Sequence, residues 1–142
     1  MITSDRERIE ALTASGGWFN KTLHGSLREH AAERPDKLAV KDQPNREELT
    51  GDKPLELSWA ELEIASDNLA QQLSDNGVGE DDPVVVQLPN VSELLVTYYA
   101  ISQIGAIISP VPVQYGSHEL NLLAGALNAK HVITLNRLRI SN

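Results

Sequence analysis

The sequence predicts an α/β fold with a parallel sheet, and three observations support this prediction. Residues 84–88 and 106–109 are almost wholly apolar, which is typical of parallel strands that are covered on both faces. Segments with the apolar period of a helix separate these strands from each other and from a further apolar segment at residues 132–135. The order strand, helix, strand, helix, strand implies two right-handed crossovers and therefore a parallel three-stranded sheet.

The expected helices begin at recognisable capping residues. Ser58 with Glu61 forms a capping box, in which two free backbone N–H groups at the helix start gain side-chain acceptors. Asn90 with Glu93 repeats the pattern before a helix that closes at residue 105. Ser117 is expected to cap the third helix.

The first third of the chain is expected to lie around this core. Residues 1–17 are predicted to be a flexible lead-in, helical near residues 6–12. A helix over residues 23–33 should follow, and the short apolar segments at 38–40 and 55–57 should pair as a hairpin. The polar stretch 43–53, which contains Pro44, Asn45 and Gly51, is predicted to be a loop.

Composition excludes several classes of function. The chain has 142 residues, 41% of them hydrophobic, and a net charge of −8, and residues 55–129 hold ten acidic side chains but no Lys or Arg. Such a surface would repel nucleic acid and anionic membranes. The uncharged stretch 94–118 is interrupted by polar residues and prolines, so we interpret it as buried helix and strand rather than a membrane span. Without cysteine or a secretory signal, the chain is predicted to be cytoplasmic.

Few residues offer catalytic chemistry. Neither a dinucleotide fingerprint nor a P-loop occurs, and an acidic magnesium cluster at strand ends, as in a phospho-receiver domain, is missing. The four histidines lack metal-ligand spacing, so we predict no metal site and no catalytic residue. Ligands of open α/β sheets gather at the carboxyl ends of strands, which makes the segments 88–90, 109–112 and 134–136 the most informative. Asn90 is the candidate binding residue there, in addition to its capping role.

The ordered series of segments resembles the N-terminal part of the adenylate-forming enzymes, the acyl- and aryl-acid CoA ligases and their acid–AMP ligase relatives. The resemblance runs from about residue 18 to residue 136. Within the family it points to bacterial CoA ligases for cyclohexanecarboxylate, medium-chain or aryl acids. The segments that carry it are Trp18-Phe19-Asn20, Arg34-Pro35-Asp36-Lys37-Leu38-Ala39-Val40, Leu57-Ser58-Trp59-Ala60-Glu61-Leu62, Leu88-Pro89-Asn90 with Glu93, and Gly105-Ala106 with Pro110.

The resemblance implies a function for a longer parent protein. Such enzymes join a carboxylic acid to AMP with loss of pyrophosphate and then pass the acyl group to CoA, using ATP, Mg²⁺ and CoA. Residues 18–142 would be an incomplete N-terminal subdomain, lacking the phosphate loop, the Mg²⁺-binding Glu, the ribose-binding Asp and the catalytic Lys. Gln114 stands where several relatives carry an Arg that meets a CoA phosphate. Asp81-Asp82 replaces a usual Gly-Asp turn, which costs little if that turn needs no left-handed residue.

We therefore expect a scaffold part of an AMP-forming carboxylic acid–CoA ligase, inactive alone, with Asn90 and Gln114 lining the substrate or CoA channel. Its partners would be the remainder of the parent enzyme and a small carboxylic acid, and the fragment is expected to self-associate. The alternatives are a non-catalytic α/β interaction module that keeps the ligase-like segment, and a small-molecule binding domain of unrelated origin.

Overall fold

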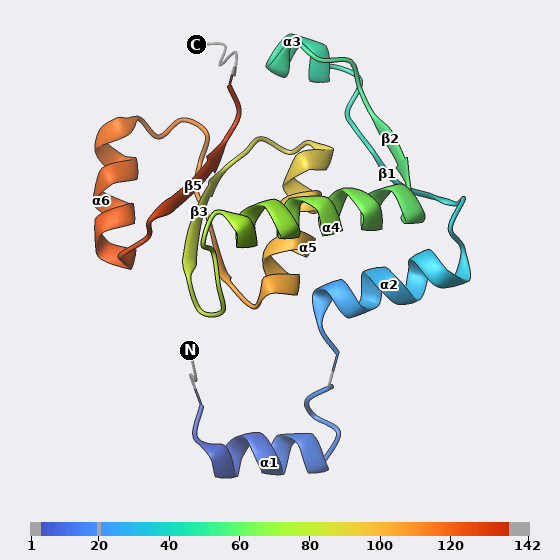
Figure 1. Ribbon diagram of the computed structural model, residues 1–142, viewed down its shortest axis with the longest axis vertical. Helices are drawn as coiled ribbons and strands as arrows, with labels where there is room; N and C mark the ends of the chain where they lie inside the picture. The colour runs from blue at the N-terminus through green and yellow to red at the C-terminus, as the bar shows by residue number, and fades with distance from the viewer. Residues whose placement is uncertain (1–3, 20, 137–142) are drawn as a thin grey trace.

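The computed structural model describes residues 4–19 and 21–136 (Figure 1). This part of the chain forms six helices and five strands, which alternate from α2 onward. They are α1 (Arg6–Ala14), α2 (Leu23–Glu33), β1 (Leu38–Lys41), α3 (Arg46–Thr50), β2 (Glu56–Ser58), α4 (Trp59–Asp75), β3 (Pro83–Gln87), α5 (Ser92–Ile104), β4 (Ile107–Pro110), α6 (Ser117–Leu127) and β5 (His131–Thr134).

A parallel sheet with the strand order β4–β3–β5 forms the centre of the fold. The middle strand β3 is fully enclosed, because Val84 and Val85 point to opposite faces and each is 0% exposed. The α/β class and the parallel three-stranded core predicted from the sequence are confirmed.

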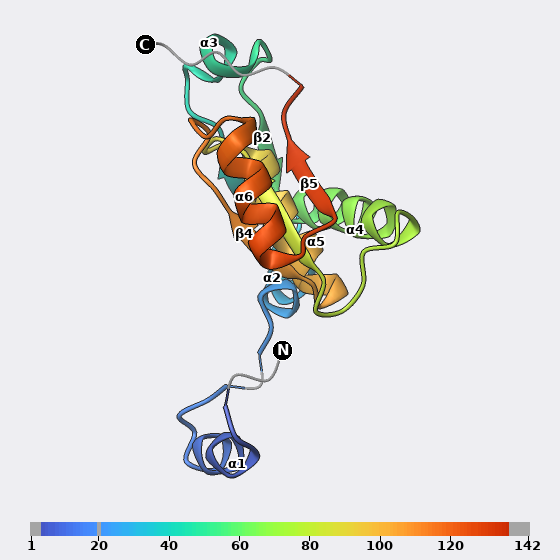
Figure 2. The same cartoon turned by 90° about the vertical axis from the view of Figure 1, so that its left-hand side faces the viewer.

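Helices cover both faces of this sheet (Figures 1 and 2). The helices α4 and α5 lie on one face and α6 lies on the other, while α2 packs against α4 and α5. Chain travel across the sheet reverses at β4, so two crossovers of the same hand must place α5 and α6 on opposite faces. The main core lies under α4 and α5 and is built from Val78, Val84, Val86, Leu88 and Ile101.

Two local predictions in the first half of the chain are confirmed. Ser58 and Glu61 form the expected capping box, with Ser58 N–H donating to Glu61 Oε2 at 2.8 Å and Glu61 N–H donating to Ser58 Oγ at 3.3 Å. The backbone N–H of Ser58 lowers the pKa of the Glu61 carboxyl below its ordinary value. The strands β1 and β2 pair as an antiparallel hairpin, with Lys41 opposite Glu56.

The prediction of a continuous loop over residues 43–53 is wrong, because α3 occupies five of these residues. A five-residue helix has too little periodicity to be detected in sequence, and its own hydrogen bonds do not offset the cost of starting a helix. Tertiary contacts stabilise it instead. Arg46 and Thr50 in this helix are both buried.

The capping box predicted at Asn90 and Glu93 is also wrong. The N-cap of α5 is Val91, which has no side-chain acceptor, and the helix begins at Ser92. Glu93 does not turn back toward the start of the helix but pairs with Arg46. The acceptor that Asn90 was expected to provide comes from Asp42 in the hairpin, whose Oδ1 accepts the Ser92 N–H at 2.7 Å.

The start of α6 differs from its prediction by one residue. Gly116, rather than Ser117, is the N-cap, and Glu119 Oε2 accepts the Gly116 N–H at 2.9 Å.

The turn before β3 does need a left-handed residue, so the condition under which Asp81-Asp82 would cost little is not met. Asp81 has a φ of 63°, in the left-handed region where Gly is favoured and Asp is among the better tolerated side chains. Its N–H donates to Gly105 O at 3.0 Å, which ties the turn to the end of α5.

The helix expected near residues 6–12 is present as α1. No helix within the described ranges is long and apolar enough to cross a membrane.

Candidate functional site

Topology singles out one edge of the sheet. The adjacent strands β3 and β4 lead into α5 and α6, which lie on opposite faces, so the two loops diverge from neighbouring strand ends. In open α/β sheets this reversal of direction marks the usual place of ligand binding. We refer to the loops 88–91 and 111–116 together as the β3–β4 edge.

The first loop of the β3–β4 edge is short and held at both ends. Leu88 and Val91 are buried, and Val91 N–H donates to Pro89 O at 2.8 Å in a tight turn. Asn90 lies exposed between these fixed points. One of the two predicted site residues is therefore a surface side chain on a well-anchored turn.

A buried polar cluster lies directly behind this loop and consists of Asp42, Arg46, Ser92 and Glu93. Arg46 donates through Nη1 to Asp42 Oδ2 at 2.5 Å, and through Nη1 and Nη2 to the two Glu93 oxygens at 2.8 and 2.5 Å. The side chains of Asp42 and Arg46 are 1% and 4% exposed. Both Nη atoms of this guanidinium are occupied by carboxylates, while its buried Nε has no hydrogen-bond partner among the described residues, so Arg46 is not free to meet a phosphate.

Asp42 remains charged in this buried setting because its oxygens receive several donors. Burial alone would raise the pKa of Asp42, but the Leu55 N–H, the Arg46 guanidinium and the Ser92 N–H outweigh burial and lower it. The hydrogen bond with Glu93 raises the pKa of Arg46 above its ordinary value. Asp42 and Arg46 are therefore both charged at neutral pH.

Sequence reasoning missed this cluster entirely. Asp42 and Arg46 stand in a polar stretch that has the composition of a surface loop, and Glu93 was assigned to a local cap. No local pattern signals an ion pair between residues that are 47 positions apart.

The second loop of the β3–β4 edge is tied to the end of β3. Val111 N–H donates to Val86 O at 2.9 Å, and Gln87 Nε2 donates to Pro112 O at 3.1 Å and Tyr115 O at 2.8 Å. Gln114, the second predicted site residue, is exposed within the turn that Gln87 spans. The structure thus places Asn90 and Gln114 on the loops that follow two neighbouring strands.

Replacing Gln87 with Met is expected to loosen this turn. The variant keeps the side-chain length but removes both donors, and because the carbonyls can turn to water the loss should be about 1 kcal/mol. Urea unfolding will measure that loss, and amide hydrogen exchange should show weaker protection around residues 112–115. Gln72→Met on the exposed side of α4 is the control. Unchanged exchange in the turn would contradict the role of Gln87.

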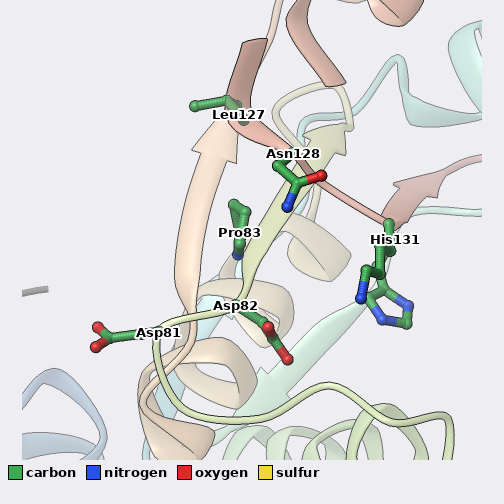
Figure 3. A pocket seen from close by; sticks show the side chains of 7 residues that line it. Asp81, Asp82, Pro83, Leu127, Asn128 and His131 are labelled. Carbon is green, nitrogen blue, oxygen red and sulfur yellow. The ribbon is translucent and has the colours of Figure 1, made fainter. Parts of the chain in front are cut away.

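Two further hollows lie elsewhere on the described surface. One of about 240 Å³ lies at the amino ends of β3 and β5, the edge opposite the β3–β4 edge (Figure 3). Asp81, Asp82, Lys130 and His131 bring charges of both signs to it, and in the view shown Asp81 points away from the other side chains. A second hollow, of about 400 Å³, lies between the end of α3 and residues 135–136.

Two of the four histidines, His24 and His30, have structural partners. His30 packs edge-on against Trp59 with ring centroids 4.7 Å apart, and its Nδ1 lies 3.1 Å from Arg34 Nη2. His24 Nδ1 lies 3.2 Å from Ser102 Oγ. Within residues 4–19 and 21–136, His, Asp and Glu side chains form no group of three that could hold a metal ion.

The fold and the β3–β4 edge define the class of this protein. The fold is similar to the apo structure of MbtA from Mycobacterium smegmatis, with a TM-score of 0.74 and 28% identity over 93% of this chain and 23% of that one. This is the N-terminal part of an adenylate-forming enzyme.

A family comparison identifies the chain more closely. The model described as AMP-binding enzyme matches residues 27–142, so the chain belongs to that family. A salicyl-AMP ligase / salicyl-S-ArCP synthetase of Mycobacterium tuberculosis is 36% identical over 71% of this chain and 17% of its own length. A long-chain-fatty-acid–CoA ligase of Bacillus subtilis is 31% identical over 84% of this chain and 20% of its own length. The chain thus spans about a fifth or less of these curated relatives.

Proposed function

We propose that this chain is the N-terminal scaffold of an enzyme that activates a small carboxylic acid with ATP and then transfers the acyl group to CoA. The observation that supports the proposal is the family match over residues 27–142, combined with a sheet whose β3–β4 edge is the place where such folds bind ligands. The chain is similar to both an acid–AMP ligase and a CoA ligase, so CoA as the acyl acceptor is a separate part of this proposal.

The residues of this chain do not fit Mg²⁺ and ATP by themselves. Residues 55–129 contain no Lys or Arg, and Arg46 is already paired with two carboxylates. The described side chains also form no acidic group that could hold a cation. We therefore assign triphosphate binding and the chemical step to other parts of the parent enzyme, and assign to this chain the shaping of one wall of the acid or CoA channel.

Asn90 and Gln114 are the residues that we propose for this wall. Both are exposed and both carry a neutral amide that can donate and accept. The turn of Asn90 is held by the buried Leu88 and Val91, and the turn of Gln114 is held by the hydrogen bonds from Gln87. Neutral hydrogen-bonding groups on an otherwise uncharged edge suit the orientation of an acyl or pantetheine-like chain rather than the binding of phosphate.

Two measurements test the proposal on the native gene product. Its intact mass should greatly exceed the 15.5 kDa of this chain. It should also catalyse carboxylate-dependent exchange of labelled pyrophosphate into ATP, with some member of a panel of aliphatic, alicyclic and aryl acids. A native product of the size of this chain, with no exchange activity, would instead support a non-catalytic interaction module.

Variants then test the wall itself. Asn90→Ala should raise the KM for the acid, and Gln114→Arg should lower the KM for CoA several-fold, because a guanidinium adds a charge-assisted hydrogen bond to phosphate. Asn68→Ala and Gln72→Arg, both on exposed positions of α4, are the matched controls. Equal effects of the site variants and the controls would remove Asn90 and Gln114 from the proposal.

We also propose that the 142-residue chain associates with itself when it is isolated. The helix α5, which is uncharged after Glu93, packs against α2 and α4, but α6 has no fully buried residue, and Leu122 and Val132 are 67% and 49% exposed. Light scattering across the micromolar range should show a rising mean mass, which Leu122→Glu should reduce. Ile64→Glu on α4 is the control. A stable monomer that binds no apolar dye would contradict this prediction.

A further inference from the structure

The start of α5 is fixed by a residue from a different element. Val91 offers no capping side chain, and the Ser92 N–H would otherwise be a buried donor without an acceptor. Asp42, fifty residues earlier, supplies the acceptor through Oδ1 at 2.7 Å. The hairpin β1–β2 therefore determines where α5 begins.

Asp42 also binds the hairpin to itself. Its Oδ2 accepts the Leu55 N–H at 2.9 Å and the Ser92 hydroxyl at 3.3 Å, besides Arg46. Arg46 then reaches Glu93 through two parallel hydrogen bonds, the most direction-specific form of ion pair. The two sides of the hairpin loop, α3 and the first turn of α5 are thus locked together by one carboxylate and one guanidinium.

The cluster of Asp42, Arg46, Ser92 and Glu93 lies only a few residues along the chain from the first loop of the β3–β4 edge. Asn90 lies two positions before Ser92, and the turn that carries it runs between buried Leu88 at the end of β3 and buried Val91. Because β3 is held inside the sheet, the remaining freedom of the turn is set by the position of the first turn of α5. A shift of α5 therefore moves Asn90.

We propose that Asp42 and Arg46 are positioning residues for the Asn90 loop, and through it for the carboxylic acid that binds at the β3–β4 edge; the second part rests on the proposed function. A buried ion pair contributes little net stability compared with apolar side chains of the same size. What charged groups provide better than apolar contacts is a defined direction and distance. Here the ion pair fixes the position of the first turn of α5, which begins two residues after Asn90.

The first test uses the 142-residue chain and needs no ligand. Asp42→Asn keeps the shape of the side chain but cannot accept from Leu55, Ser92 and Arg46 together. Amide hydrogen exchange at Ser92 and the neighbouring residues 90–94 should become about tenfold faster, the effect of losing one hydrogen bond to a charged group. Exchange at residues 112–115 should stay unchanged. The control is Lys41→Gln, which removes the charge of the residue before Asp42 and so breaks the exposed Lys41–Glu56 ion pair. Unchanged exchange at residues 90–94 in Asp42→Asn would overturn the proposal.

The second test uses the native gene product. Asp42→Asn should raise the KM for the acid by about tenfold or more and leave the KM for ATP unchanged, because a misplaced contact of about 1 Å is costly in an oriented site. Glu93→Gln is a milder variant, since Glu93 is 39% exposed and its loss should not prevent folding. It should change the same constants in the same direction by a smaller factor.

The outcomes separate the two proposals. Faster exchange at residues 90–94 with an unchanged KM for the acid in both variants would mean that the cluster only stabilises the fold, and would overturn the positioning role. A different outcome is a native gene product that shows no carboxylate-dependent pyrophosphate exchange, while Asp42→Asn still speeds amide hydrogen exchange at residues 90–94. That result would refute the proposed function, and the control of the Asn90 loop by Asp42 would stand.

Discussion

Arg46→Met is expected to lower the free energy of unfolding by about 3 to 5 kcal/mol. The variant keeps the apolar stem but removes the cation that pairs with Asp42, and leaving one member of a buried ion pair unpaired costs about this much. Urea unfolding followed by circular dichroism will measure the loss. Lys41→Met, which breaks an ion pair whose side chains are 61% and 55% exposed, should cost under about 1 kcal/mol. Equal losses in the two variants would contradict the burial argument.

The same cluster predicts how stability depends on pH. The pKa of Asp42 is lowered from its ordinary 3.8, so in the unfolded chain Asp42 binds a proton at a higher pH than in the folded one. Its contribution is therefore complete above about pH 5 and is lost as the pH falls through the folded pKa, which lies below 3.8. The difference in stability between the natural chain and Asp42→Asn should be constant from pH 7 to 5 and shrink below pH 4. A difference that grows on acidification would contradict this sign.

The second large effect is the absence of adenylation by the 142-residue chain alone. Loss of a single electrostatic contact to the reacting groups typically costs about 10² to 10³ in rate. Residues 55–129 contain no Lys or Arg that could hold triphosphate, and the side chains that the structure describes form no group of three that could hold its cation. Carboxylate-dependent exchange of labelled pyrophosphate into ATP should stay at the background of a protein-free sample. The native gene product serves as the positive control.

The opposite outcome would be informative about the site. Turnover by the purified chain that disappears in Asn90→Ala or Gln114→Ala would mean that the β3–β4 edge performs chemistry itself. The assignment of the chemical step to other parts of the parent enzyme would then be wrong.

Patterns of residues that are close together in the sequence predicted much of this fold. Residues 84–86 are apolar without alternation, which is what a strand covered on both faces requires, and β3 is that strand. The capping box of Ser58 and Glu61 spans four residues, so it works in the folded protein as it reads in the sequence. Placing Asn90 and Gln114 at strand ends needed only the order of strands and helices.

The failures at α3 and at the start of α5 involve partners that are distant in sequence. Asn90 and Glu93 have the spacing of a cap, but Arg46 competes for Glu93, and two charge-assisted hydrogen bonds outweigh one bond to a backbone N–H. With Glu93 withdrawn, Ser92 takes its acceptor from Asp42. The helix α3 has no independent signal because its burial comes from the same ion pairs.

By itself the sequence determined the α/β class, the parallel core and the family resemblance, since these depend on periodicity, strand order and local spacing. Only the tertiary structure decided that Asp42 and Arg46, from a stretch that reads as a surface loop, set the start of α5 behind Asn90. The physical reason is that a buried charge is stabilised only by specific partners at hydrogen-bonding distance, and those partners lie 4 to 50 residues away along the chain.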